Sequence, residues 1–361
     1  MSDFISVAQP DIGRKERRAV MRVLKSGNLV QGKEVKGFED EFSRWVADRK
    51  CVAVNSGTSA LHVALLSLGI KPGDEVIIPS FTFAATANIV ALTGATPVFV
   101  DISLDNFCID PLSIERAITS KTKAIVPVHL YGHPADMETI LKIAKRYSLL
   151  VLEDAAQAHG ARIGSQPVGS FGDAAAFSFY PSKNMTSGEG GMIVAPNEEV
   201  CRTSRLLRNQ GMEKRYENEI VGYNLRMTDI HAAIGRVQLE KLDLYNGLRR
   251  QNARFLNENI RGVVTPTERS GYRHVYHQYT IRVIGHDRDR FCSELEKLGV
   301  GSGVYYPIPV HRLPSFNKTD YLANTEKAAL QVISLPVHPQ LKYKHLERIV
   351  SAVNKVANAG A

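Results

Sequence analysis

A single lysine, Lys183, lies within the stretch Ala176-Phe-Ser-Phe-Tyr-Pro-Ser-Lys-Asn-Met-Thr-Ser-Gly-Glu-Gly-Gly191, among apolar and hydroxyl-bearing residues. The apolar run Met192–Ala195 follows, so we expect the lysine on a loop between two strands. Lysine is usually a solvated surface residue. A lysine withdrawn from water loses its proton more easily and becomes nucleophilic, which makes Lys183 a candidate for Schiff-base chemistry. An ordinary loop lysine is the alternative, and the rest of the chain has to decide between the two.

Short apolar runs and helical patterns alternate through the first two-thirds of the chain. The runs predicted as strands cover residues 51–55, 75–79, 97–101, 124–128 and 149–152. Helical patterns cover residues 60–68, 84–92 and 137–147. Buried strands that alternate with helices favour a mostly parallel sheet covered on both faces, so we expect an α/β fold.

The pattern changes near residue 240. A long helical pattern covers residues 239–259, and a strand-like run and two further helices follow at residues 276–283, 288–298 and 344–357. A chain of 361 residues is long for one simple core. We therefore predict a large domain over residues 1–240 and a smaller C-terminal α+β domain over residues 241–361.

The charge and composition exclude some classes of protein. A hydrophobic content of 44% with 23% charged residues is typical of a globular protein. The net charge is +8, but the basic residues are scattered along the sequence, so no nucleic-acid surface is indicated. A mild positive field does favour anionic small molecules.

The cysteines and the N-terminus point to a cytoplasmic protein. Cysteines stand far apart at positions 51, 108, 201 and 292, which indicates neither a metal site nor a disulfide framework. Residues 1–5 lack a basic stretch followed by an apolar core, and no apolar run reaches membrane-spanning length. We therefore expect a cytoplasmic location and no membrane partner.

In open α/β sheets, ligands bind where strands end and helices begin. The first such junction is Asn55-Ser-Gly-Thr-Ser-Ala-Leu61, where a strand runs into Gly57 and small hydroxyl residues open a helix. Free N–H groups and the helix dipole favour a phosphate there, and Thr58 and Ser59 add hydroxyl donors. A plain Ser/Thr helix cap is the alternative.

The second junction is Val151-Leu-Glu-Asp-Ala-Ala-Gln-Ala-His159. Asp154 ends an apolar strand, and Gln157 follows about one helical turn later. A carboxylate in that place can hold a proton on a heteroaromatic nitrogen and keep the ring an electron sink, while Gln157 can reach a ring substituent. A capping aspartate is the alternative.

Two further features complete a candidate cofactor site. Ser178 precedes Lys183 on the same strand-to-loop path and can donate to a phosphate. Phe81 and Phe83 lie beyond another strand end, where an aromatic ring can stack on a planar cofactor or pack in the core. Together with the acid and the lysine, these features describe a site for pyridoxal 5′-phosphate.

The chain resembles the sugar aminotransferases of the DegT/DnrJ/EryC1/StrS family, which belong to the fold-type I group of pyridoxal-phosphate enzymes. The resemblance runs nearly end to end. It is carried by residues 56–61, 79–83, 153–157, 177–183 with 188–191, and 222–227. It implies a fold-type I transferase with pyridoxal 5′-phosphate as cofactor.

The resemblance implies a role for each site residue. Lys183 is expected to bind the cofactor and move the proton during the reaction, and Asp154 to pair with the ring nitrogen. Gln157 is expected to contact the ring hydroxyl and Phe83 to stack on the ring. The residues expected to hold the phosphate are Gly57, Thr58, Ser59, Ser178 and, from the neighbouring subunit, Asn224. The protein is therefore expected to form a homodimer with shared active sites.

The resemblance also implies the reaction and its substrates. L-glutamate is expected to give its amino group to a keto group of a nucleotide-diphosphate sugar, in the biosynthesis of amino sugars for surface polysaccharides or glycans. The Tyr131–Met137 segment is similar to that of relatives that aminate carbon C4, so C4 is favoured and C3 is the alternative. Candidate substrate contacts are Asn28, Tyr306, His311 and Arg312, each with a structural role as the alternative. Position 28 often holds a bulky aromatic residue in the family.

Three other functions are open to a chain of this kind. Some relatives carry a histidine in place of the lysine and act as sugar dehydratases, which Lys183 argues against. A non-catalytic regulator that binds the cofactor would not need the full catalytic set. A fold-type I enzyme acting on amino acids is disfavoured by the Gly222–Met227 segment.

Overall fold

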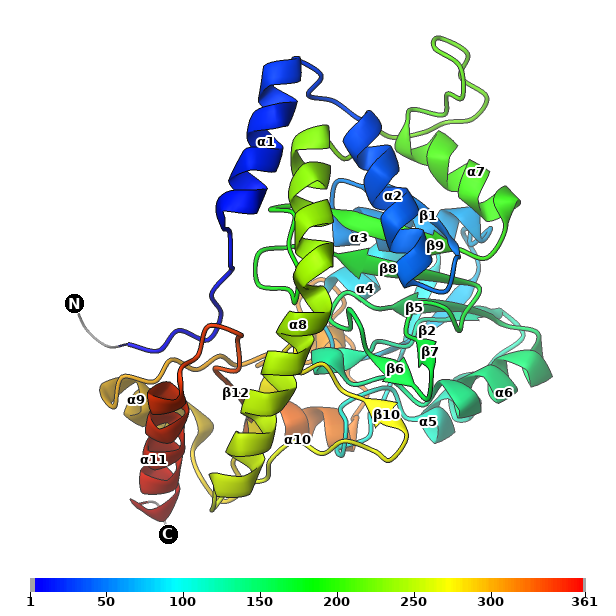
Figure 1. Cartoon of the computed structure of the whole chain (residues 1–361). Helices are drawn as coiled ribbons and strands as arrows, with labels where there is room; N and C mark the ends of the chain where they lie inside the picture. Colours follow the sequence, from blue (N-terminus) through cyan, green and yellow to red (C-terminus); the bar gives the residue numbers. More distant parts are fainter. Residues whose placement is uncertain (1–3, 360–361) are drawn as a thin grey trace.

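A computed structural model describes residues 4–359 and has a seven-stranded sheet at its centre (Figure 1). The first three residues, which form part of the N-terminal segment considered for a targeting sequence, lie outside the described residues. The strand order is β1 (Lys50–Val54), β9 (Gly191–Ala195), β8 (Ala174–Ser178), β5 (Leu150–Asp154), β4 (Thr122–Ile125), β2 (Glu75–Pro79) and β3 (Thr96–Val100). β9 runs antiparallel to both of its neighbours, and the other pairs are parallel. The expected α/β fold with a mostly parallel sheet is confirmed.

Helices cover both faces of this sheet. Because successive side chains of a strand point to opposite faces, Ala174 and Ala176 of β8 pack in one cluster, and Ala175 and Phe177 pack in another. The first face is covered by α3 (Gly57–Ser67), α4 (Ala85–Leu92) and α7 (Glu198–Arg208). The second is covered by α2 (Lys33–Trp45), α5 (Pro111–Ala117), α6 (Met137–Tyr147) and α8 (Asp229–Asn259).

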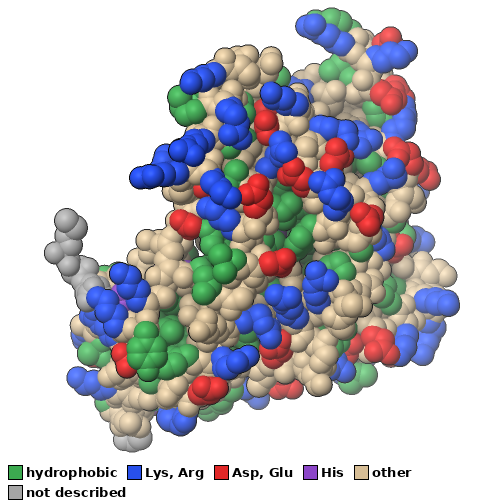
Figure 2. Space-filling model, in the orientation of Figure 1, with side chains coloured by type: hydrophobic (Ala, Val, Ile, Leu, Met, Phe, Trp, Pro, Cys, Tyr) green, Lys and Arg blue, Asp and Glu red, His purple; other side chains and the backbone are tan. Residues whose placement is uncertain are grey.

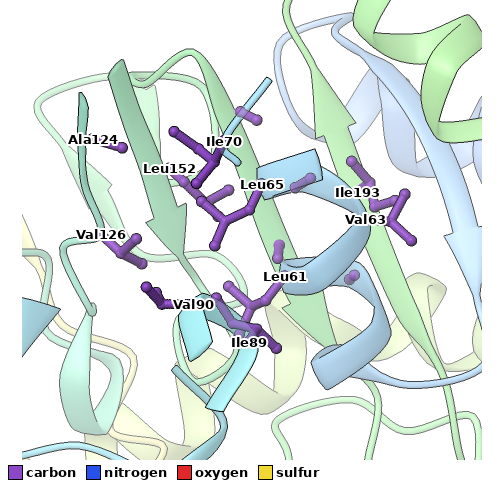
Figure 3. Packing of buried hydrophobic residues seen from close by; sticks show 14 of the residues in the cluster. Leu61, Val63, Leu65, Ile70, Ile89, Val90, Ala124, Val126, Leu152 and Ile193 are labelled. Atoms are coloured by element: carbon purple, nitrogen blue, oxygen red, sulfur yellow. The ribbon is translucent and has the colours of Figure 1, made fainter. Parts of the chain in front are cut away.

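α3 is the helix that the site depends on most. Leu61 and Leu65 are buried and lie among side chains of the sheet and of α4, as Figure 3 shows. Full burial of a leucine side chain contributes about 1.5–3 kcal/mol, so this contact fixes the helix firmly on the sheet. The helix ends before Gly69, whose φ of 82° suits glycine. Its N-terminus is thereby held at the edge of the sheet where the strands end.

α8 joins the sheet to a second core. Its first half, including Leu242, packs in a cluster with the sheet, and its second half, including Leu256, packs in the C-terminal cluster. That cluster is built from β11 (Tyr279–Arg282), β12 (Val332–Leu335), α9 (Arg288–Lys297) and α11 (Tyr343–Ala359). The predicted boundary near residue 240 thus falls inside a continuous helix, and the division into two domains stays a prediction.

The remaining elements frame these two cores. They are α1 (Arg14–Ser26), α10 (Ala323–Gln331), the small sheet of β6 (Arg162–Ile163), β7 (Gln166–Pro167) and β10 (Tyr272–Arg273), and the short helices η1 (Leu130–Gly132) and η2 (Val310–Arg312). Figure 2 shows Lys and Arg side chains gathered over α1, whose 13 residues include six basic ones, so the basic residues are locally concentrated there. Among residues 4–359, every helix is too short or too polar to cross a bilayer.

One buried carboxylate organises the sheet edge where β5 ends. Glu153 is fully buried and accepts N–H bonds from Phe171 at 2.7 Å, from Gly172 at 2.8 Å and from Gly169 at 2.8 Å. His129 Nε2 lies 3.0 Å from the same carboxylate, and His129 Nδ1 accepts the Ala135 N–H at 2.9 Å. Because Nδ1 is an acceptor, the ring is neutral and Nε2 carries the hydrogen that it donates to Glu153.

We expect Glu153→Gln to destabilise the fold strongly. One end of the new amide would present its own N–H groups to two buried donors, and unsatisfied buried donors of this kind cost about 2–5 kcal/mol together. Chemical denaturation measures the free energy of unfolding. Glu138→Gln is the matched control, because Glu138 is exposed and pairs with the exposed Lys142, and the loss of this pair should leave that free energy nearly unchanged. Equal stabilities of the two variants would contradict the prediction.

Candidate active site

A pocket of about 580 Å³ lies at the edge of the sheet where β1, β2, β5 and β8 end and β9 begins. Its volume is in the range of small-molecule sites. The residues that line it follow each strand in turn and include Ser56, Gly57, Thr58, Thr82, Phe83, Thr86, Asp154, Gln157, Ser178, Tyr180, Lys183, Glu189, His277 and Tyr306. The parallel sheet therefore brings together side chains from distant parts of the sequence.

The N-terminus of α3 forms an anion-binding end of this pocket. Ser56 is its N-cap and accepts the Ser59 N–H at 3.1 Å, so the N–H groups of Gly57 and Thr58 precede the first capped position and face outward. A Cβ at Gly57 would stand 2.6 Å from the Ser178 Cβ, so only glycine allows the helix to approach β8 this closely.

The hydroxyl groups at this end differ in where they point. Thr58 and Ser178 line the pocket, as predicted from the sequence. The Ser59 hydroxyl instead donates to Asn55 Oδ1 at 2.7 Å, and Ser59 lies outside the lining. Ser56 lines the pocket but was not among the predicted residues, although it belongs to the same motif.

Asp154 lies at the other end of the pocket. Its carboxyl is only 4% exposed, with Oδ2 accepting the Thr86 hydroxyl at 2.8 Å and Oδ1 accepting the Ala156 N–H at 3.1 Å. Burial raises the pKa of Asp154, while the Thr86 and Ala156 hydrogen bonds and the charge of Lys183 oppose that rise. The carboxyl is therefore held in one orientation, with a lone pair of each oxygen left free.

Lys183 is half-buried in the wall of the same pocket. Burial lowers the pKa of its amine to about 8, while Asp154 acts in the opposite direction. The loop that carries it is fixed, because Asn184 Nδ2 donates to Asn246 Oδ1 at 2.8 Å and to the Val275 carbonyl at 3.1 Å. The lysine is thus a positioned amine with a large neutral fraction near pH 8.

Gln157 is held by two neighbours. Its Oε1 accepts the Tyr131 N–H at 2.8 Å, which settles which end of the amide is oxygen. Nε2 then donates to the Tyr306 hydroxyl at 3.1 Å and keeps a second hydrogen for a ligand. Burial raises the pKa of Tyr306, so its hydroxyl stays protonated and can donate in turn.

The two phenylalanines after β2 have separate positions. Phe83 lines the pocket with 57% of its surface exposed, whereas Phe81 is 1% exposed in the core beside Phe107 and Tyr131. The Phe83 ring centroid lies 6.0 Å from that of Tyr306. Phe83 is therefore the ring available to a planar ligand.

His311 and Arg312 lie outside the pocket lining and are bound to the protein itself. His311 is fully buried, with Nδ1 at 2.5 Å from the Ser80 hydroxyl and Nε2 at 3.0 Å from the Asp320 carbonyl. Arg312 Nε donates to Glu326 at 2.8 Å. These bonds fasten the segment after Tyr306 to the end of β2.

Asn28 and Asn224 are exposed and also lie outside the lining of this chain's pocket. The structure thus brings together Lys183, Asp154, Gln157 and Tyr306, but not these two. His277 lines the pocket although no sequence pattern pointed to it, because it comes from a loop of the C-terminal third. Thr86, which also lines the pocket, stands three residues after the predicted Phe83.

The residues present fit a phosphorylated pyridine aldehyde. Gly57 keeps open a cradle that any Cβ would fill, and helix N–H groups and hydroxyls supply the donors for a phosphate. At the far end, a buried carboxylate matches a ring nitrogen, an amide N–H matches a ring hydroxyl, and a lysine amine matches an aldehyde. Each donor set suits one part of the molecule.

We expect Lys183 in the cofactor-free protein to react with an amine-selective acylating reagent with a pH midpoint near 8. The neutral amine is the reactive form, and burial brings the pKa to about 8 from an ordinary 10.5. Mass spectrometry of the Lys183 peptide measures the rate. Asp154→Asn should move the midpoint lower, because the Asp154 charge raises this pKa. A midpoint near 10.5 would contradict the burial argument.

The chain is similar to known proteins along nearly its whole length. It is 42% identical to the "Pleiotropic regulatory protein" of Geobacillus stearothermophilus, over 93% of this chain and 92% of the relative. It is 40% identical to "dTDP-3-amino-3,4,6-trideoxy-alpha-D-glucose transaminase" of Streptomyces venezuelae, over 98% of this chain and 95% of the relative.

Solved structures are similar to this chain over nearly the same length. DesV of S. venezuelae in complex with a ketimine intermediate has a TM-score of 0.92 and 41% identity, over 95% of this chain and 94% of that chain. The PLP form of Spr1654 of Streptococcus pneumoniae has a TM-score of 0.93 and 28% identity, over 99% of this chain and 100% of that chain. The model of the DegT/DnrJ/EryC1/StrS aminotransferase family matches residues 10–354, and the chain belongs to this family.

Proposed function

We propose that the protein is a pyridoxal 5′-phosphate-dependent aminotransferase that moves the amino group of L-glutamate to a keto group of a nucleotide-linked sugar. The observation that carries the proposal is one pocket in which Lys183, with its lowered pKa, and the buried Asp154 meet the phosphate cradle of α3. The S. venezuelae relatives, one named as a transaminase of a dTDP-linked amino sugar, support the substrate class.

Each residue has a defined task in this reaction. Pyridoxal phosphate, when bound, supplies an aldehyde and a conjugated ring that delocalises the electron pair left when a substrate carbon loses its proton. Lys183 Nζ would take the proton from the carbon of glutamate that gives up nitrogen, and in the second half of the reaction it would donate a proton to the sugar carbon that receives nitrogen. With a pKa of about 8, the amine is suited to both steps near neutral pH. Asp154 holds the ring proton, and Gln157 and Phe83 orient the ring.

The choice among related functions follows from the same residues. A lysine at position 183 supports amino transfer over sugar dehydration. Amino transfer needs a free side-chain amine beside the substrate that takes a proton from one carbon and, once protonated, gives a proton to another. The name of the G. stearothermophilus relative suggests regulation as a second candidate. A regulator has no need of a lysine with a lowered pKa facing a buried acid, so the enzyme is the better-supported function.

We further propose a homodimer with shared sites. Asn224 lies on an exposed segment with Val221, which is 92% exposed, and Tyr223, which is 40% exposed. Apolar side chains exposed in this way are typical of a surface that packs on a partner. A second copy on this surface would let Asn224 reach the phosphate end of the neighbouring pocket. A cytoplasmic location stays a prediction of the sequence.

We expect the purified protein to aminate a nucleotide-linked keto sugar when glutamate is supplied. A panel of UDP-, dTDP- and GDP-linked 3-keto and 4-keto sugars, read by mass spectrometry, identifies the substrate. The sequence favours C4, whereas the name of the dTDP-sugar relative places its amino group on C3, so both positions are needed. Lys183→Ala should lose product formation and the glutamate-dependent change in cofactor absorbance. A colourless protein whose absorbance does not change when glutamate is added would exclude the aminotransferase function.

We expect mixed dimers to regain activity when Lys183→Ala and Asn224→Ala chains are co-expressed. In a mixed dimer one site carries both defects and the other carries neither, so about a quarter of the wild-type activity returns with random pairing. Lys183→Ala with Asp154→Asn is the matched control, because both residues line the same chain's pocket and no intact site can form. Recovery in the control, or none in the first mixture, would contradict the shared site.

A further inference from the structure

The first turn of α4 forms the wall of the pocket next to Asp154. Thr86 stands three residues after Phe83, lines the pocket, and is 1% exposed. One short segment after β2 therefore supplies both the ring available for stacking and a buried hydroxyl group. A buried hydroxyl needs a hydrogen-bond partner, and the partner that this one has is the buried acid of the site.

Thr86 Oγ1 donates to Asp154 Oδ2 at 2.8 Å. An ionised carboxylate only accepts hydrogen bonds, so this donor is matched to the ionised form of the acid. The hydroxyl of Thr82 also lies 3.4 Å from Thr86 Oγ1. With Ala156 N–H on Oδ1, each carboxylate oxygen has one protein donor and room for one ligand donor.

The Thr86 hydroxyl and the Ala156 N–H influence where a proton lies between Asp154 and a bound cofactor. A proton between Asp154 and a pyridine nitrogen can sit on the oxygen or on the nitrogen, and the total charge is the same in both forms. Burial alone favours the neutral acid. Hydrogen bonds donated to the carboxylate are stronger when it is ionised, so they favour the form with the proton on nitrogen.

We propose that Thr86 is a positioning residue that holds Asp154 ionised and facing the pocket, so that the shared proton stays on the cofactor's ring nitrogen. The proposal rests on the proposed role of Asp154 but not on the identity of the sugar. Thr86 acts through Asp154 and needs no contact of its own with the reacting atoms. A purely structural threonine would fill the same space without setting the proton.

The test uses the full-length protein loaded with pyridoxal 5′-phosphate labelled with ¹⁵N at the ring nitrogen. NMR of the bound cofactor reports whether that nitrogen is protonated, independently of activity. Thr86→Val keeps the shape but removes the hydroxyl, and we expect the ¹⁵N signal to move toward the value of an unprotonated ring. Thr86→Ser restores the donor and should restore the wild-type signal.

The dissociation constant of the cofactor gives a second readout. We expect it to rise about fivefold to tenfold in Thr86→Val, the difference between a hydrogen bond to a charged acceptor and one to a neutral acceptor. With a cofactor analogue that has carbon in place of the ring nitrogen, Thr86→Val should no longer raise the dissociation constant. The matched control is Thr93→Val at the C-terminal end of the same helix, where the Thr93 hydroxyl donates to the Val90 carbonyl at 2.7 Å. It should leave the ¹⁵N signal and the dissociation constant unchanged.

The possible results separate this proposal from the one before it. If Asp154→Asn shifts the ¹⁵N signal and Thr86→Val does not, the role of Thr86 is wrong and that of Asp154 stands. If Asp154→Asn leaves the signal unchanged, the role of Asp154 is wrong and the role of Thr86 falls with it. An equal shift in Thr86→Val and Thr93→Val would also overturn the proposal. In an Asp154→Asn background, Thr86→Val should add nothing further.

Discussion

The buried carboxylate of Glu153 is the interaction on which the site depends. It accepts hydrogen bonds from the backbone of residues 169–172 and from His129, and thereby ties together the loops on both sides of β5. Four donors satisfy a charge that would otherwise be costly to bury. The next residue is Asp154, so the same bonds that close the sheet edge fix the acid of the pocket. The position of Asp154 in the pocket therefore depends on the hydrogen bonds that Glu153 forms at the sheet edge.

The charges inside the pocket are balanced against burial. Burial moves the pKa of Asp154 up and that of Lys183 down, and each group partly reverses the shift of the other. The proton affinities of acid and amine are thus brought closer together than in water. A site that must pass protons between ligand atoms and side chains benefits from this, because neither side holds the proton too firmly. The neighbouring Thr86 and Ala156 donors tune the acid end.

Much of the fold and part of the site followed from the sequence because their signals are local. Strands ending in Asp154 or before Gly57 are short apolar runs, and parallel strands bring their ends to one edge whatever the details of packing. The burial of His311, the bond from Gln157 to Tyr306 and the position of His277 depend on contacts between residues over a hundred positions apart. No local pattern encodes such contacts. The sequence pattern predicted this helix only from residue 239, whereas α8 begins at Asp229, so its continuity with the first core was not predicted.

Because α8 is one continuous helix, the number of residues within it cannot change without effect on the fold. A loop between two cores can gain or lose a residue with little effect, but a helix turns by about 100° per residue. One residue inserted between Leu242 and Leu256 would rotate the C-terminal cluster about the helix axis relative to the sheet. Tyr306, which belongs to the C-terminal third, would then no longer meet Gln157. Variation among natural homologues should therefore be found in residue type along this helix and not in its length.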